Sequence, residues 1–144
     1  MTTELTAQNS PPVPPRDDPL TQFFWDGVDA HELRILKCDN CGKFVHWPRP
    51  VCRFCLSTSL TPTRVSGKGR LHTWTIPLQP FDPYFLERLP YVLAVVELDE
   101  QPGLMVVTDI VDCAEDDLRA DMPVEVTFRE VAPGYTLPLF APAS

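Results

Sequence analysis

The sequence of 144 residues has no apolar run approaching the roughly 20 residues that a helix needs to cross a bilayer. Its N-terminus, MTTELTAQNS, has neither the basic start nor the apolar core of a secretion signal. The sequence also lacks a G-x-G-x-x-G fingerprint, a P-loop and a G-x-S-x-G elbow. We therefore expect a cytoplasmic protein that does not span a membrane, with no catalytic site marked by a short motif.

Long helices are not expected either, because 17 prolines are distributed along the chain. From Ser66 onward the pattern is that of strands joined by turns. The sequence predicts five strands, which are GRLHTWTIPL (69–78), YVLAVVEL (91–98), LMVVTDIV (104–111), PVEVTFREV (123–131) and TLPLF (136–140). A short helical turn, AEDDLRA, separates the third strand from the fourth. Five strands with a helical turn at this point predict an OB-fold barrel over residues 63–144.

The N-terminal part of the chain divides into a tail and a helical arm. Residues 1–16 are polar and contain PPVPP, so we expect a disordered tail. Over residues 17–32, Asp18 is a plausible N-cap for a helix with Pro19 at its first position. This helix is either part of the core or an exposed aromatic face that docks into a partner, and we favour the second alternative. The candidate partner-binding residues here are Phe23, Phe24 and Trp25.

Four cysteines in residues 33–62 have the spacing C-x2-C-x10-C-x2-C. Two such pairs suit tetrahedral zinc, because each tight turn presents two sulfurs. The predicted ligands of one structural zinc ion (or of iron in a recombinant preparation) are Cys38, Cys41, Cys52 and Cys55. The alternative is four buried or disulfide-bonded cysteines. A closed shell of four sulfurs leaves no position for water or substrate, so we expect no catalysis at the metal.

No other residues form a recognisable catalytic set. The neighbours of Cys113 are acidic and would raise the pKa of its thiol, so we expect a small buried apolar residue. We expect structural roles for His46, between the cysteine pairs, and for His72, in the first barrel strand. The acidic cluster at 115–117 is interpreted as a helix N-terminus.

Charge is distributed unevenly along the chain. Residues 37–73 have seven basic residues and one acidic residue, a net charge of +6, and the rest has five basic and 19 acidic residues, a net charge of −14. The basic segment either balances the metal-bound thiolates or steers a phosphate-bearing ligand. Between the first two barrel strands, the aromatic loop 79–91 is either a plug of the barrel or a wall against a ligand or partner. Its candidate partner-binding residues are Phe81, Tyr84 and Phe85.

The order of helix, four-cysteine ribbon and OB barrel resembles a specific family, the acyl-CoA-associated proteins with a rubredoxin-like zinc ribbon and an OB fold. The resemblance rests on CDNCG and CRFC, on GKGRLHTWT, on PYVLAVVELDE, and on TDIVDCAEDDLRADMPVEVTF followed by LPLF. It extends from about Asp18 to the C-terminus. The chain departs from the family at Ala120 and Asp121, where a glycine is usual.

The resemblance implies a non-catalytic subunit of a thiolase-superfamily enzyme. The chain most resembles those family members that pair with an aldolase of steroid side-chain breakdown. That aldolase is similar to sterol-carrier thiolases and cleaves a β-hydroxyacyl-CoA by retro-aldol chemistry. A hotdog-fold hydratase is another partner of the family. This chain would stabilise the partner and shape the entrance for CoA and the acyl group. Candidate phosphate neighbours are Arg49, Arg53, Lys68 and Arg70.

Two other functions remain open from the sequence. A single-stranded nucleic-acid-binding module would need a basic groove with exposed aromatics. From Leu71 onward, however, three arginines stand against thirteen acidic residues, so no nucleic acid is expected. A stand-alone acyl-CoA-binding protein or enzyme would bind or turn over CoA esters by itself.

Overall fold

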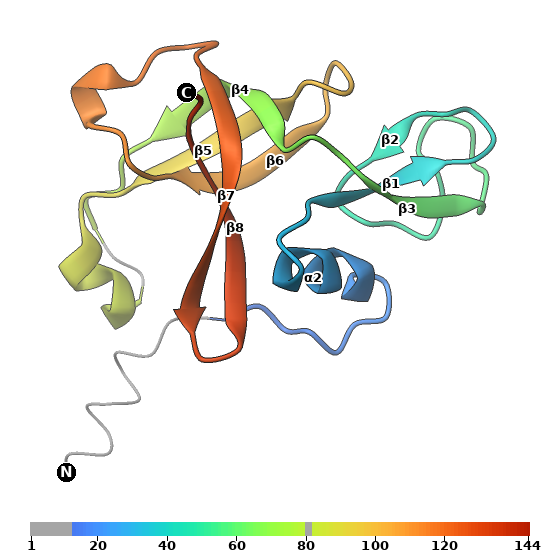
Figure 1. Cartoon of the computed structure of the whole chain (residues 1–144), viewed down its shortest axis with the longest axis horizontal. Coiled ribbons are helices and arrows are strands. Elements are labelled where there is room, and N and C mark those ends of the chain that lie inside the picture. The colour runs from blue at the N-terminus through green and yellow to red at the C-terminus, as the bar shows by residue number, and fades with distance from the viewer. Residues whose placement is uncertain (1–12, 80–81) are drawn as a thin grey trace.

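The computed structural model describes residues 13–79 and 82–144, which form two small β structures joined to one α-helix (Figure 1). Most of the predicted tail and Phe81 lie outside the described residues. The α-helix is α2 (Gln22–Asp29). The strands are β1 (Arg34–Cys38), β2 (Phe44–Val45), β3 (Leu60–Arg64), β4 (Lys68–Thr75), β5 (Val92–Leu98), β6 (Met105–Ile110), β7 (Pro123–Ala132) and β8 (Tyr135–Pro142). Two 3-10 helices are η1 (Pro83–Arg88) and η2 (Glu115–Asp117).

The C-terminal half is a closed barrel with the strand order β4-β5-β6-β8-β7. This confirms the predicted OB fold, including the helical turn η2 between β6 and β7. Neighbouring strands are antiparallel except β6 and β8, which run parallel and pair only at Ile110 and Phe140. Inward residues alternate along β5, where Val92, Ala94, Val96 and Leu98 are buried. The alternation in the sequence therefore corresponds to the inside and outside of the barrel.

The metal-binding segment is a three-stranded antiparallel sheet with the order β2-β1-β3. Its last strand, β3, has the sequence LTPTR, and the cysteine spacing gave no indication of it. β3 pairs along the whole of β1, from Cys38↔Leu60 to Arg34↔Arg64. No residue of β3 is buried, so its sequence has no apolar alternation, and its proline is tolerated at the edge of a sheet.

The helix begins later than the sequence predicted. α2 starts at Gln22, preceded by Thr21, and Asp18 is not its N-cap. Asp18 instead closes a turn, where its Oδ1 accepts a hydrogen bond from the Leu20 N–H (2.9 Å) and its carbonyl accepts one from the Thr21 N–H (3.1 Å). An aspartate before proline favours such a turn as much as a helix cap, because its side chain bonds to the backbone two residues later.

The aromatic face of α2 is buried, so the exposed aromatic face that we favoured is wrong. Phe24 is 2% exposed and Trp25 is 7% exposed, and Val28 is fully buried. These three residues share one apolar core with the barrel residues Leu71, Val96 and Phe140, and with Leu33 and Ile35 at the start of the ribbon. The sequence pattern is the same for both alternatives, because periodicity marks an apolar face without saying what covers it.

The ribbon has a smaller core of its own, and Phe23 joins the two cores. Leu36, Cys38, Val45 and Cys52 are buried together in the ribbon. Phe23 is half-buried and packs against both this cluster and the larger core. Helix α2 therefore contacts both β1 of the ribbon and β8 of the barrel, and Figure 1 shows it beneath the ribbon and beside β8.

Two polar contacts reinforce this arrangement. The side-chain amide of Gln101, in the β5–β6 turn, accepts a hydrogen bond from the Phe44 N–H (2.8 Å) and donates one to the Phe44 carbonyl (3.1 Å). Arg16 forms an ion pair with Asp29 (2.8 Å) and donates to the Thr136 carbonyl (3.1 Å). Its guanidinium lies between two aromatic rings, 5.3 Å from Trp25 and 5.0 Å from Tyr135. The segment before α2 is thus attached to both the helix and β8.

The departure from the family pattern at Asp121 has a simple structural basis. Asp121 has a positive φ of 64° and donates its N–H to the Leu71 carbonyl (2.9 Å). A glycine takes this left-handed conformation without steric cost, and aspartate is among the residues that tolerate it. The turn into β7 is therefore formed without the glycine.

Gly67, at the start of the barrel, needs both its conformation and its lack of a side chain. Its φ is +76°, and a Cβ placed on it would lie 2.3 Å from Val126 Cγ1. Its carbonyl accepts a hydrogen bond from the Val126 N–H (2.8 Å), so the two backbones cannot separate without losing this bond. Gly134 has a similar φ of +78°, but a Cβ placed on it would have nothing within 4 Å.

We expect Gly67→Ala to lower the free energy of unfolding by about 2–5 kcal/mol, the sum of a left-handed alanine and an overpacked contact. Gly134→Ala, the matched control, lowers it by about 1–2 kcal/mol through the conformation alone. Urea denaturation of both variants measures the difference. Equal losses would show that the contact with Val126 relaxes without cost.

Candidate metal centre

The four predicted ligands lie together at one end of the ribbon sheet. Their Sγ atoms are all within 4.8 Å of one another, with 3.6 Å between Cys38 and Cys55 and 3.7 Å between Cys41 and Cys52. Tetrahedral zinc with sulfur at about 2.3 Å requires sulfurs roughly 3.8 Å apart. The four cysteines therefore fit one structural zinc ion with a closed shell of sulfur, as predicted.

Each cysteine pair lies on a tight backbone turn. In the first, the Gly42 N–H donates to the Cys38 carbonyl (2.9 Å), and Gly42 has a φ of 75°. In the second, the Leu56 N–H donates to the Cys52 carbonyl (2.9 Å). The two turns thus have the same design and present two sulfurs each.

Leu56 occupies the position in the second turn that glycine occupies in the first. It has a φ of 65° and is 76% exposed. A left-handed conformation costs a leucine roughly 1–2 kcal/mol, and the shape of the turn imposes it. The sequence interpretation missed this feature, although the equivalent spacing after Cys41 and Cys55 could have revealed it.

The protein surroundings shift the thiol pKa values of Cys41 and Cys55 in opposite directions. The Asn40 side-chain amide donates to Cys55 Sγ (3.4 Å), and this bond is the main cause that lowers the pKa of Cys55 to about 6. The backbone N–H of Lys43 lowers the pKa of Cys41, but burial and the neighbouring sulfurs outweigh it and raise that pKa to about 11. Thiolates this close repel one another, and a bound divalent cation offsets this electrostatic repulsion.

His46 lies between the two cysteine pairs in sequence but is not among the four ligands that cluster. Its ring is half-buried against Phe24 (5.7 Å between ring centres) and Trp47 (5.0 Å), and burial lowers the pKa of its imidazole to about 4. Its Nδ1 is buried without a hydrogen-bond partner. The residue is therefore a neutral part of the packing at neutral pH.

The four candidate phosphate neighbours belong to two separate elements. Arg49 and Arg53 are exposed beside the second cysteine turn and line a shallow hollow with Leu56. Lys68 and Arg70 are exposed on β4, where Arg70 donates to the Asp121 carbonyl (3.3 Å). The ribbon pair has an aromatic neighbour that the sequence interpretation missed. Phe54 is 44% exposed, with the Arg53 guanidinium 4.8 Å and the Lys43 ammonium 5.3 Å from its ring centre.

The described part of the aromatic loop packs mainly on itself. Phe85 stacks on Tyr91 (5.2 Å between ring centres), and Arg88 covers Tyr84 (3.6 Å to the ring centre). No residue of η1 is buried, so the described part of this loop does not plug the barrel. Leu86 is 63% exposed at its surface.

The remaining sequence candidates do not form a catalytic set. Cys113 is half-buried against the core, and burial raises the pKa of its thiol, which makes it a poor nucleophile. His72 is exposed on β4. Within residues 13–79 and 82–144, no histidine forms a hydrogen bond to a serine, threonine or cysteine. In the same residues, no helix has the length and apolar character that crossing a bilayer requires.

Two family descriptions match the chain, "ChsH2, rubredoxin-like zinc ribbon domain" over residues 25–61 and "ChsH2, C-terminal OB-fold domain" over residues 62–129. Among solved structures, the chain is similar to a chain of the "Ltp2-ChsH2(DUF35) aldolase". The two are 32% identical with a TM-score of 0.81, and the match covers 91% of this chain and 100% of that one.

Curated relatives have names of the same kind as these matches. A "DUF35 domain-containing scaffold protein" of Methanothermobacter thermautotrophicus is 38% identical over 102 residues, 70% of this chain and 74% of that protein. A "Probable enoyl-CoA hydratase alpha subunit" of Thermomonospora curvata is 33% identical over 143 residues, 98% of this chain. This chain spans 44% of the length of that relative. The chain belongs to the DUF35 family and has both ChsH2-type domains, which confirms the resemblance found in the sequence.

We expect the purified protein to hold one zinc ion per chain, and Cys41→Ser to lose it, because three sulfurs cannot complete the closed shell. Cys113→Ser is the matched control, since it removes the one cysteine outside the cluster. Zinc content by atomic absorption and the melting temperature measure the effect. Full zinc occupancy in Cys41→Ser would contradict the assignment of the four ligands.

We also expect a pH effect from His46. Its pKa falls from 6.5 to about 4 on folding, so the unfolded chain binds the proton first as the pH decreases. The resulting stability is fully present above pH 6.5 and is lost as the pH falls to about 4, a difference of about 3 kcal/mol. Urea denaturation at several pH values should show a smaller acid loss in His46→Phe than in the parent. The exposed-residue control His72→Phe should keep the parental loss, and identical profiles for all three would contradict the assignment.

Proposed function

We propose that this chain is a non-catalytic subunit of a thiolase-superfamily enzyme that acts on acyl-CoA. The observation that carries the proposal is the likeness to the whole of one chain in the "Ltp2-ChsH2(DUF35) aldolase". The match covers 91% of this chain and so includes both the ribbon and the barrel. Its TM-score of 0.81 therefore reflects the arrangement of the two parts as well as their separate folds. The described residues of this chain also lack a catalytic set, which fits a partner that performs the chemistry.

The reaction that we propose for the complex is retro-aldol cleavage of a steroid side-chain β-hydroxyacyl-CoA. The partner is an aldolase of the sterol-carrier-thiolase type, and it holds the reacting groups. The resemblance noted in the sequence supports this substrate class, and the cytoplasm, where thiolates stay reduced, suits the zinc ribbon. A hotdog-fold hydratase is the alternative partner, supported by the hydratase subunit among the relatives.

We propose that the ribbon face with Arg49 and Arg53 lies near the CoA moiety. Two arginines supply positive charge for phosphates, and the exposed ring of Phe54 offers a flat surface for an adenine base. The aromatic loop with Tyr84 and Phe85, and the edge of α2 at Phe23, stay candidate partner contacts. Phe24 and Trp25 are too buried to contribute more than the ring edges that line a groove.

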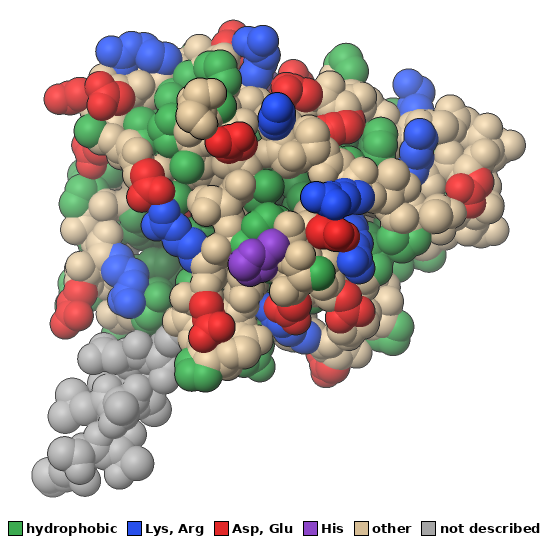
Figure 2. Space-filling view, in the orientation of Figure 1, with side chains coloured by type: hydrophobic (Ala, Val, Ile, Leu, Met, Phe, Trp, Pro, Cys, Tyr) green, Lys and Arg blue, Asp and Glu red, His purple; other side chains and the backbone are tan. Residues whose placement is uncertain are grey.

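Nucleic-acid binding has less support. OB folds bind single strands across their second and third strands, which here are β5 and β6. The outward residues on these strands include Leu93, Val95 and Val107, which offer neither positive charge nor aromatic stacking. Figure 2 shows acidic and basic side chains intermixed over the barrel on the face that it displays, rather than a basic strip.

Co-expression with a thiolase-like aldolase of the sterol-carrier-thiolase type from the same organism tests the proposal. We expect the two chains to elute together in size-exclusion chromatography and to cleave a β-hydroxyacyl-CoA only when both are present. Separate elution, with full activity of the partner alone, would contradict the subunit role. Co-elution with a hydratase and addition of water to an enoyl-CoA would identify the alternative partner.

The same assay tests the CoA contact through a charge reversal. Arg53→Glu should raise KM for the CoA ester at least tenfold with little change in kcat, because it removes ground-state and transition-state binding alike. Arg64→Glu makes the same change at an exposed residue of β3, away from the second cysteine turn, and should leave KM unchanged. An equal KM in both variants would remove the CoA contact from the proposal but not the subunit role.

A further inference from the structure

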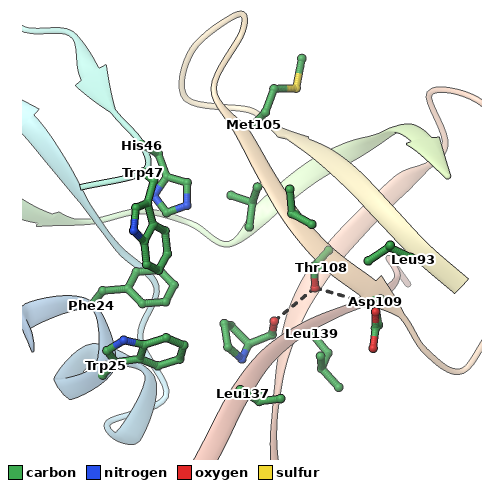
Figure 3. A pocket seen from close by; sticks show the side chains of 13 residues that line it. Phe24, Trp25, His46, Trp47, Leu93, Met105, Thr108, Asp109, Leu137 and Leu139 are labelled. Carbon is green, nitrogen blue, oxygen red and sulfur yellow. Dashed lines mark hydrogen bonds between the residues drawn. The ribbon is translucent and has the colours of Figure 1, made fainter. Parts of the chain in front are cut away.

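A groove of about 570 Å³ lies between the ribbon with α2 and the outer surface of the barrel (Figure 3). Phe24, Trp25 and Trp47 form one wall, and Val107 on β6 faces them with Leu137 and Leu139 on β8. Its volume falls within the roughly 300–1,000 Å³ of sites for small molecules. The lining is mostly apolar on both sides, so a ligand here would be covered on two faces.

The aromatic wall is already in place. Trp47 is 47% exposed but packs edge-on against Phe24 (5.2 Å between ring centres) and Trp25 (6.4 Å). Phe24 and Trp25 belong to the main core, so the wall is fixed by the fold. A preformed site does not have to be ordered when a ligand binds, and this favours affinity.

Few polar groups reach the groove, and two of them have no partner for their side chains. The Thr108 hydroxyl is occupied, since it bonds to the Pro138 carbonyl (3.2 Å) and the Asp109 carbonyl (3.3 Å). The Asp109 carboxyl forms no ion pair or hydrogen bond with the described residues, and burial raises its pKa. The His46 ring has one buried nitrogen without a partner, and its other nitrogen has no hydrogen bond to a described residue.

The charge of the lining selects the kind of ligand. No lysine or arginine lines the groove, and its acid is Asp109. A phosphate or carboxylate placed here would lose its hydration beside a carboxyl group, without a cation to compensate. The CoA part of a thioester is therefore unsuited to the groove. A partner protein is a weaker match as well, because such interfaces extend over about 800 Å² per partner rather than filling a compact groove.

We propose that this groove binds one uncharged, mainly apolar small molecule. Figure 3 shows His46 on the ribbon side and Asp109 on the barrel side, so a hydroxyl or carbonyl group of the ligand would meet one of these two side chains. The site is distinct from the metal centre and from the ribbon face assigned to CoA. It does not depend on the proposed function, because the groove is formed entirely by this chain.

Titration of the full chain with the neutral dye Nile red tests the site. We expect saturable binding of one dye per chain with a micromolar Kd. Quenching of tryptophan fluorescence should accompany it, since two of the three tryptophans line the groove. Decan-1-ol should displace the dye, and decanoate at pH 8, which differs by its charged end, should do so at least tenfold less well.

Val107→Arg blocks the groove from an exposed position, since Val107 is 71% exposed, and should weaken dye binding at least tenfold. Thr73→Arg makes the same change in charge at an exposed position of β4 outside the groove and should leave binding unchanged. Equal melting temperatures for both variants confirm that the fold is kept.

Three results would overturn the proposal. Dye binding that does not saturate, or that is equal in Val107→Arg and the parent, would show that the groove is not the site. Equal displacement by decanoate and decan-1-ol would contradict an uncharged ligand. Stoichiometric displacement of the dye by a co-purifying partner protein would make the groove a protein-docking surface. The outcome is separate from that of the co-expression experiment, which does not measure dye binding.

Discussion

Phe24, Trp25 and Val28 of helix α2 lie in one apolar core with residues from every strand of the barrel, while Phe23 on the same helix packs against the ribbon core. Burying a side chain of this size contributes about 2 kcal/mol, so the loss of any one of them is large compared with the net stability of a small domain. Neither the ribbon nor the helix has enough apolar surface to fold independently. The position of the metal centre relative to the barrel, the groove between them and the direction of the N-terminal segment all follow from this one packing arrangement.

The metal centre and the helix stabilise the ribbon in different ways. The four sulfurs join the two cysteine turns at one end, where the chain has few apolar residues to bury. The helix covers the other side, where Leu33 and Ile35 enter the main core. A segment of this size needs both, because its own core consists of four buried residues, two of which are metal ligands. The charge pattern is consistent with this division, since the basic residues Lys43 and Arg53 lie close in sequence to cysteines that carry negative charge when they bind a cation.

Much of this architecture is local in sequence and was predicted correctly. The spacing of the four cysteines determines the ligands, and the alternation from Leu71 to Phe140 determines the barrel strands, because both patterns depend on neighbouring residues. The burial of α2, the existence of β3 and the groove could not be predicted, because they depend on which surfaces meet across the chain. Leu56 is an intermediate case. Its conformation follows from the repeat of the cysteine turn, yet a leucine gives no signal of its own for a positive φ.

The side chain of Gln101 links the barrel to the ribbon, which are separate segments of the sequence. Its amide imitates a peptide group, giving β2 the pair of hydrogen bonds that another strand would supply. β2 contains two residues and lies directly after the first cysteine turn. The turn between β5 and β6 therefore serves as an additional rung of the ribbon sheet. Phe44 and Gln101 therefore form a direct hydrogen-bonded link between the segment that follows the first cysteine turn and the β5–β6 hairpin of the barrel.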